Sequence, residues 1–173
     1  MWDPRAALDT IIQSSTVDLF HACSVAVAPL KRSTASAKAM GADRLIGTIE
    51  FSSISMTGSA TLSVPSALFA AAMASGPRKP SSSDWIRELT NQLLGRVKKR
   101  LAQFQVSLQT GLPSLPTQDR LQRLRSGSSS PNVYEFRALR GEIIVVLDAT
   151  IDYSALRYSG TLKLANEGDI ILF

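Results

Sequence analysis

Residues 84–104 read DWIRELTNQLLGRVKKRLAQF and have the clearest periodicity in the sequence. Wound at about 100° per residue, this segment gathers its apolar side chains on one stripe: Ile86, Leu89, Leu93, Leu94, Val97, Leu101 and Phe104. The pattern predicts an amphipathic helix from Asp84 to Phe104 whose apolar stripe is buried in a protein core.

The opposite side of this helix is polar and carries Glu88, Asn91, Gly95, Lys98, Lys99 and Ala102. Glu88 and Asn91 are three residues apart and are therefore neighbours on the helix surface. Gly95 lies one turn beyond Asn91, although glycine in a helix interior costs about 1 kcal/mol relative to alanine. Its missing side chain would let the backbone of another molecule approach closely. This side of the helix is predicted to be a docking face.

The Asn91 carboxamide beside the Glu88 carboxylate suits phosphoryl hydrolysis. Because a carboxamide donates and accepts hydrogen bonds at once, it can hold a water in line with a phosphorus atom without being a strong base. A solvated polar face also contains such pairs. The Glu-x-x-Asn motif alone therefore leaves both interpretations open.

The N-terminal segment predicts a second long helix. Asp3 and Pro4 favour a helix start, and the apolar positions that follow recur at helical spacing: Leu8, Ile11, Ile12, Leu19, Phe20 and Cys23. A strand around Ser24–Leu30 and a loose, basic loop over residues 31–42 are expected next.

Two strands and a short helix are predicted between that loop and residue 84. Residues 45–53 and 55–64 are rich in apolar and β-branched side chains at period two, which indicates an antiparallel pair with Gly58 as a bulge or a close approach. Pro65 opens a short helix, which ends at Gly76.

The C-terminal third predicts strands separated by polar loops. Strands are expected at residues 105–108, 133–138 and 142–153, and a closing hairpin over 161–173. Residues 117–132 are predicted to be a polar connection that is mobile over 126–131. Together the elements predict one α+β domain, residues 1–173, with 154–173 as a hairpin extension. Two long helices and a short helix are expected on one face of a mostly antiparallel sheet.

The helix motif resembles the signature helix of the CheX, CheC and FliY chemotaxis phosphatases. The resemblance covers roughly residues 5 to 152 and rests mainly on Glu88, Asn91, Gly95 and Lys98. Weaker likenesses are Ile49–Phe51, Gly58–Leu62, Pro65 and Leu112–Pro116. By this resemblance we expect a CheX-like domain.

The resemblance implies that the chain removes the phosphoryl group from a phospho-aspartate on a CheY-like receiver domain. Asn91 would orient the attacking water, and Glu88 would pair with the receiver's active-site lysine. No cofactor or metal is expected in this chain, because Mg2+ would stay on the receiver. The family also implies a homodimer joined through sheet edges.

Two departures from the family pattern are Arg96, where a small polar residue is common, and residues 154–173, which run past the expected end. Both would alter partner choice. CheC-type relatives carry two such helices, whereas Asp9, Ile12 and Ser15 occupy the comparable positions of the N-terminal helix. One site per chain is therefore predicted.

Composition narrows the function classes. The chain has 19 lysine and arginine residues against 14 aspartate and glutamate residues, a net charge of +5. That excess favours an acidic protein, nucleic acid or an anionic surface as partner, or it only keeps the domain in solution. The single cysteine, the lack of a secretory signal and the lack of a membrane-length apolar run favour a cytoplasmic protein that does not enter membranes.

Other reactive residues receive structural interpretations. His21 is predicted to be a partly buried structural histidine without metal-binding partners, and Cys23 a buried small hydrophobe. The basic cluster of Arg96, Lys98, Lys99 and Arg100 ends the long helix, where cations also offset the helix dipole. It is predicted to be a solvated face that also flanks Glu88 and Asn91 and speeds encounter with an acidic receiver.

Two other functions compete with the phosphatase. The same helix could recognise a receiver without catalysing hydrolysis, with activity lost through a change such as Arg96. A nucleic-acid-binding domain is the weaker alternative, because the basic segments lack interleaved aromatic residues for base stacking.

Overall fold

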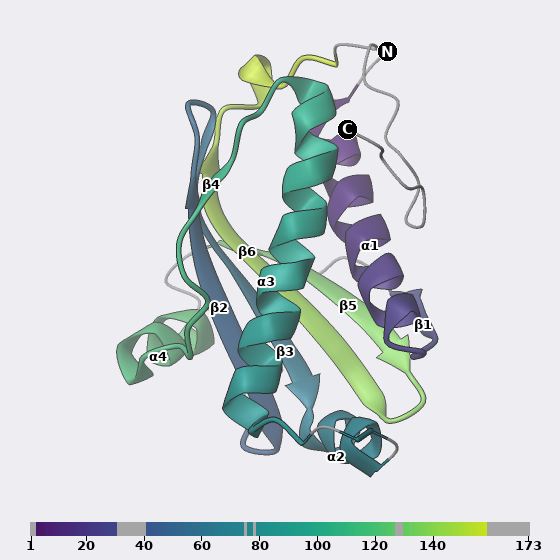
Figure 1. The fold of residues 1–173 in the computed structure, drawn as a ribbon. Coiled ribbons are helices and arrows are strands. Elements are labelled where there is room, and N and C mark those ends of the chain that lie inside the picture. The colour runs from purple at the N-terminus through teal and green to yellow at the C-terminus, as the bar shows by residue number, and fades with distance from the viewer. Residues whose placement is uncertain (1–2, 31–40, 75, 78, 127–129, 159–173) are drawn as a thin grey trace.

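The computed structural model describes residues 3–30, 41–74, 76–77, 79–126 and 130–158. Its central feature is a six-stranded sheet in the order β1-β5-β6-β3-β2-β4 (Figure 1). The strands are β1 Val27–Pro29, β2 Arg44–Ser52, β3 Met56–Pro65, β4 Gln109–Thr110, β5 Asn132–Ala138 and β6 Gly141–Ile151. Every pairing of these strands is antiparallel. The predicted hairpin over 161–173 and most of the predicted loop over 31–42 lie outside the described residues.

Two long helices lie side by side over one face of the sheet, with a short helix at one end (Figure 1). They are α1 Pro4–Ala22, α3 Ser82–Leu101 and the short α2 Ser66–Ala74. Single 3-10 turns follow at Ala102–Phe104 and Tyr153–Ala155. The predicted α+β fold, with these helices on one face, is confirmed.

The first correction concerns the strand predicted at residues 105–108. Gln105 has a φ of 60° and ends the helical segment in the left-handed region, which breaks the extended geometry that a strand requires. Val106 and Leu108 are buried in the core, and pairing with β2 begins one residue later, at Gln109.

The second correction concerns residues 117–132, predicted to be a loop. They contain helix α4, Gln118–Ser126, which covers the sheet face opposite to α1 and α3. Leu124 packs there with Val133, Ile144 and Val146. With only Leu121 and Leu124 as large apolar residues, the segment has too short a stripe for helical periodicity to emerge.

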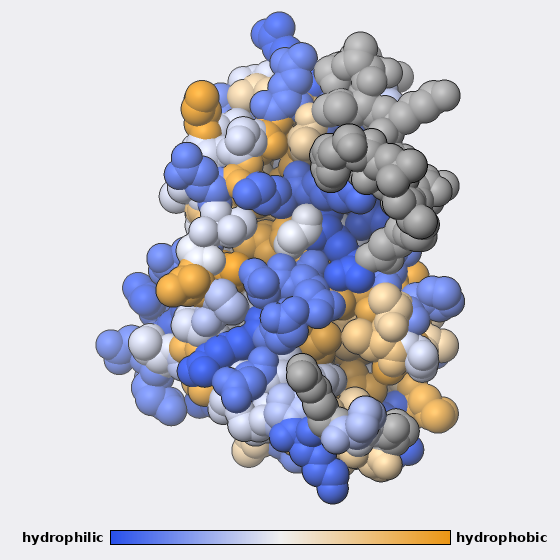
Figure 2. Space-filling view, in the orientation of Figure 1, coloured by the Kyte–Doolittle hydropathy of each residue, from blue (hydrophilic) through white to orange (hydrophobic). Residues whose placement is uncertain are grey.

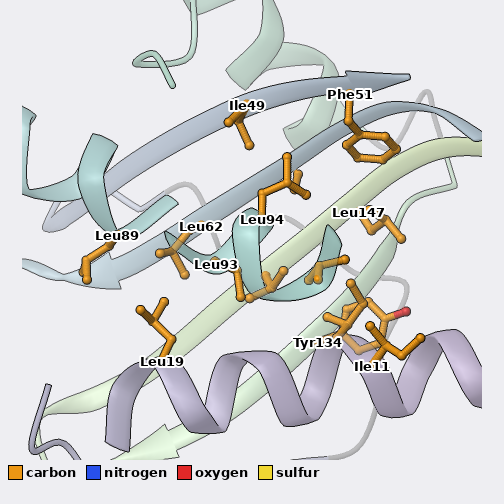
Figure 3. Close-up of a cluster of buried hydrophobic side chains, with 14 of the residues drawn as sticks. Ile11, Leu19, Ile49, Phe51, Leu62, Leu89, Leu93, Leu94, Tyr134 and Leu147 are labelled. Carbon is orange, nitrogen blue, oxygen red and sulfur yellow. The ribbon is translucent and has the colours of Figure 1, made fainter. Parts of the chain in front are cut away.

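The main core lies between the sheet and the pair α1 and α3 (Figure 3). Leu89, Leu93 and Leu94 of α3 meet Ile49, Phe51, Leu62 and Leu147 of the sheet and Ile11 and Leu19 of α1. Burial of each such side chain contributes about 1.5–3 kcal/mol. This packing fixes the rotation of α3 about its axis, so its polar side is turned away from the protein.

Gly47 sets how closely α3 approaches the sheet. A Cβ atom at this position would lie 2.3 Å from Thr90 Oγ1 and 3.0 Å from the Ile86 carbonyl oxygen. Any other residue would therefore push α3 off strand β2. Gly58 confirms the predicted close approach, since a Cβ there would lie 2.2 Å from the Asp148 carbonyl oxygen of β6.

His21 and Cys23 lie at the end of α1, and both are exposed, so the predictions of burial are wrong. The helix ends at Ala22, and Cys23 is its C-cap with a φ of −87° and a ψ of 10°, so Cys23 leaves the helical conformation and does not continue the apolar stripe. Partial desolvation of the thiol nevertheless raises the pKa of Cys23, and the nearby Arg96 guanidinium opposes that rise.

Candidate functional site

Helix α3 has a side-chain cap at its N-terminus and a basic last turn. The Ser81 hydroxyl accepts a hydrogen bond from the Asp84 amide at 3.1 Å and donates to the Asp84 carboxylate at 2.7 Å. Lys98, Lys99 and Arg100 occupy the last turn, where cations stabilise the helix dipole. Both features stabilise the helix that carries the residues of the outer side.

One row of this outer side is open to solvent and consists of Asn91, Gly95, Lys98 and Lys99, all exposed. We call these four residues the open row. Figure 2 shows a largely hydrophilic surface over the middle of this face of the molecule. A Cβ atom at Gly95 would meet nothing within 4 Å. The packing of the described chain therefore does not require glycine at this position.

Asn91 supplies the carboxamide of the open row. Its side chain is exposed and receives no hydrogen bond from the described part of the chain. Both the oxygen and the nitrogen of its carboxamide are therefore available to a water or to a partner. Glu88, one turn earlier, is also exposed.

A second row, which we call the braced row, runs at four-residue spacing through Glu88, Gln92, Arg96 and Arg100. Gln92 Nε2 donates to Glu88 Oε1 at 2.7 Å. Arg96 Nη1 donates to the Gln92 carbonyl oxygen at 3.4 Å. Arg100 donates to Ser15 Oγ at 2.8 Å and to the Asp18 carboxylate. Through Arg100 this row is tied to α1.

The predicted basic cluster is consequently divided. Lys98 and Lys99 are exposed in the open row, whereas Arg96 is half-buried and Arg100 is bound to α1. The prediction of a uniformly solvated face is wrong for Arg100, because Asp18 and Ser15 lie within its reach. The roles predicted for Gly95, Arg96, Lys98 and Lys99 in partner binding stay predictions.

The comparable positions of α1 are used inside the protein. Ile12 and Ser15 are buried, and Asp9 Oδ1 accepts a hydrogen bond from the Tyr134 hydroxyl at 2.8 Å. Helix α1 therefore presents no counterpart of the exposed Glu88 and Asn91 pair.

A hollow of about 960 Å³ lies elsewhere, on the sheet face that α4 partly covers. Glu50, Ser59 and Asp148 of the sheet and Arg120 and Arg123 of α4 line it. Arg120 bonds Ser59 and lies 3.7 Å from Glu50, so charges of both signs already face one another. The hollow shares no residue with the open row or the braced row.

The described residues contain no group of three or more histidine, cysteine, aspartate or glutamate side chains that could hold a metal ion. Among the same residues, no helix is both long and apolar enough to cross a membrane.

Sequence reasoning missed Gln92 and the tie from Arg100 to α1. The four-residue spacing of Glu88 and Gln92 could have indicated their hydrogen bond, because such pairs adjoin on a helix. The tie from Arg100 to Asp18 spans 82 residues of sequence, and spacing within one helix carries no information about it.

Comparisons with known proteins bear on the fold. The sequence matches no protein-family model and no curated protein sequence. The structure matches a CheC-like superfamily protein from Shewanella sp. PV-4 with a TM-score of 0.66 at 14% identity, over 83% of this chain and 97% of that chain.

Two further structural matches agree with this one. CheX from Vibrio vulnificus has a TM-score of 0.64 at 15% identity, over 83% of this chain and 99% of that one. A CheX–CheY–BeF3–Mg2+ complex from Borrelia burgdorferi gives 0.59 at 11% identity, over 85% and 97% of the two chains. The resemblance predicted from the long helix is confirmed at the level of structure: this chain has the fold of the CheX and CheC-like chemotaxis proteins.

Proposed function

We propose that this protein is a phosphatase that hydrolyses the phospho-aspartate of a CheY-like response regulator. The observation that carries the proposal is the outward presentation of Glu88, Asn91 and Gly95 on one helix within a CheX-like fold. One structure with this fold is a complex of CheX with CheY, which supports a receiver domain as the partner.

Asn91 acts in this proposal by positioning a water. Its carboxamide oxygen accepts a hydrogen bond from the water and directs a lone pair at phosphorus. The water oxygen forms a bond to phosphorus while the bond to the aspartate oxygen breaks, the protons of the water pass to the phosphate product, and phosphate leaves as the carboxylate is restored. Holding the water at attack distance can lower the barrier by several kcal/mol.

Glu88 and Gly95 set the docking register. The Glu88 carboxylate pairs with the receiver's lysine, and Gly95 lets a receiver loop approach the α3 backbone. Mg2+ is held by the receiver's own carboxylates and offsets charge on the phosphoryl group. No residue of this chain is required to bind it.

The basic flank favours encounter with an acidic receiver. Arg96, Lys98 and Lys99 follow the pair further along α3, and the chain carries a net charge of +5. Charge complementarity of this kind raises association rates more than affinity.

We also propose a homodimer joined through the sheet edges β1 and β4; light scattering on the purified chain would test it.

The decisive experiment follows phosphate loss from phosphorylated receiver domains with and without this protein. We expect faster loss with the wild type, and near-basal loss with Asn91→Ala. Gln122→Ala, which removes an exposed carboxamide from α4, is the matched control and should keep full activity. Unchanged activity in Asn91→Ala would remove the assignment. Binding without faster phosphate loss would instead indicate a non-catalytic module that recognises receivers.

A further inference from the structure

We infer that Gln92 is a positioning residue that holds the Glu88 carboxylate ready to bind a cation on the partner, an inference that rests on the proposed function. A glutamate on a helix surface has three rotatable side-chain bonds and populates many directions in solvent. The hydrogen bond of 2.7 Å from Gln92 Nε2 to Glu88 Oε1 selects one of them. The partner then meets a carboxylate that is already oriented.

Gln92 is suited to this role because it is neutral. A carboxylate offers about four acceptor positions, so one amide hydrogen bond orients Glu88 and leaves its charge and its second oxygen for the partner. A lysine or arginine at position 92 would orient the carboxylate equally well. It would also neutralise the carboxylate and compete with the partner's cation.

The neighbouring carboxylate on the same helix provides the contrast. The Asp84 carboxylate accepts a hydrogen bond from the Ser81 hydroxyl at 2.7 Å and lies 3.5 Å from the Arg87 guanidinium. Its charge is offset within the helix, as suits a capping residue. Glu88 instead accepts its hydrogen bond from the neutral amide of Gln92, so the charge of the Glu88 carboxylate remains for a partner.

Contacts along the braced row restrict the position of Gln92. Gln92 is half-buried, unlike the exposed Asn91 beside it, and its backbone carbonyl accepts from Arg96. Two turns later Arg100 is bound to Ser15 and Asp18 of α1. A half-buried donor on this row has fewer side-chain directions open to it than an exposed one in the open row, which is what positioning of Glu88 requires.

A double-mutant cycle between Gln92 and Glu88 tests the inference. The variants are Gln92→Ala, Gln92→Lys, Glu88→Ala and the two double variants, each assayed for KM and kcat with a phosphorylated receiver. We expect Gln92→Ala to raise KM about twofold to tenfold with kcat unchanged. Gln92→Lys should raise KM further, and neither change should have an effect when Glu88 is already alanine.

The outcomes separate this inference from the proposed function. Equal effects of Gln92→Ala in the presence and absence of Glu88, or a fall in kcat alone, overturn the role of Gln92 while phosphatase activity stands. A wild-type protein that neither binds receivers nor speeds phosphate loss overturns the proposed function and the inference with it. Thermal melts of each variant, with Gln122→Ala as control, show that a rise in KM does not come from unfolding.

Discussion

Helices α1 and α3 cover the same sheet face side by side, yet they use their polar residues in opposite ways. In α1, Ser15 and Thr16 are buried, and Asp9 and Asp18 bond to Tyr134 and Arg100. In α3, Glu88 and the open row face solvent. The difference teaches that a polar pair on a helix becomes a candidate site only when the fold leaves its hydrogen-bonding capacity outside the molecule.

The strongest test of that contrast is Asn91→Ala. If the open side of α3 performs the chemistry, loss of the water-positioning amide should lower kcat for phosphate loss about 100-fold. The free energy of unfolding should stay within about 0.5 kcal/mol of wild type, as for other surface substitutions. Denaturant titration beside the phosphatase assay measures both, and a large loss of stability would mean that Asn91 serves the fold.

Two glycines compare the buried and the outer side of α3: Gly47 of β2 lies against the buried side, and Gly95 lies on the outer side. Gly47→Ala places a methyl group against Thr90 and the Ile86 carbonyl and should lower the free energy of unfolding by about 1–3 kcal/mol. Gly95→Ala meets nothing in the described chain and should raise it by up to about 1 kcal/mol, while weakening receiver binding. Thermal denaturation and a binding titration check the pair. A Gly95→Ala protein that binds receivers normally would contradict a close approach of the partner at this position.

Both faces of α3 were predictable from the sequence, whereas features that depend on short segments or on contacts between helices were not. The apolar stripe and the exposure of Glu88 and Asn91 follow from a 3.6-residue period over twenty residues, and the alternation in β2 and β3 is equally clear. Helix α4 was not predicted because two leucines are too few to define an apolar stripe. The burial of Cys23 was predicted wrongly because α1 ends at Ala22 and Cys23 is only its C-cap. Arg100 could not be assigned, since its choice of Asp18 over solvent depends on how two helices pack.

The internal role of α1 is tested by Tyr134→Phe. This change removes the hydroxyl that donates to Asp9 and should lower the free energy of unfolding by about 1 kcal/mol, with kcat and KM unchanged. Tyr158→Phe, at a tyrosine that is 59% exposed, is the matched control and should change neither quantity. Altered kinetics in Tyr134→Phe would break the contrast, because α1 would then contribute to the site.

The smallest expected effect concerns Lys98 and Lys99, the basic end of the open row. Replacing both with glutamine should slow association with an acidic receiver a few-fold at low ionic strength, because steering depends on long-range charge. The difference should vanish near 1 M salt, where the screening length falls to about 3 Å. Stopped-flow binding across a salt series measures it. The control is the double change of Arg123 and Arg125 to glutamine, which removes the same two charges from exposed positions on α4. Equal slowing by this control would assign the steering to the net charge of the molecule, and a loss confined to the lysines would place it on the outer side of α3, where α1 has no equivalent.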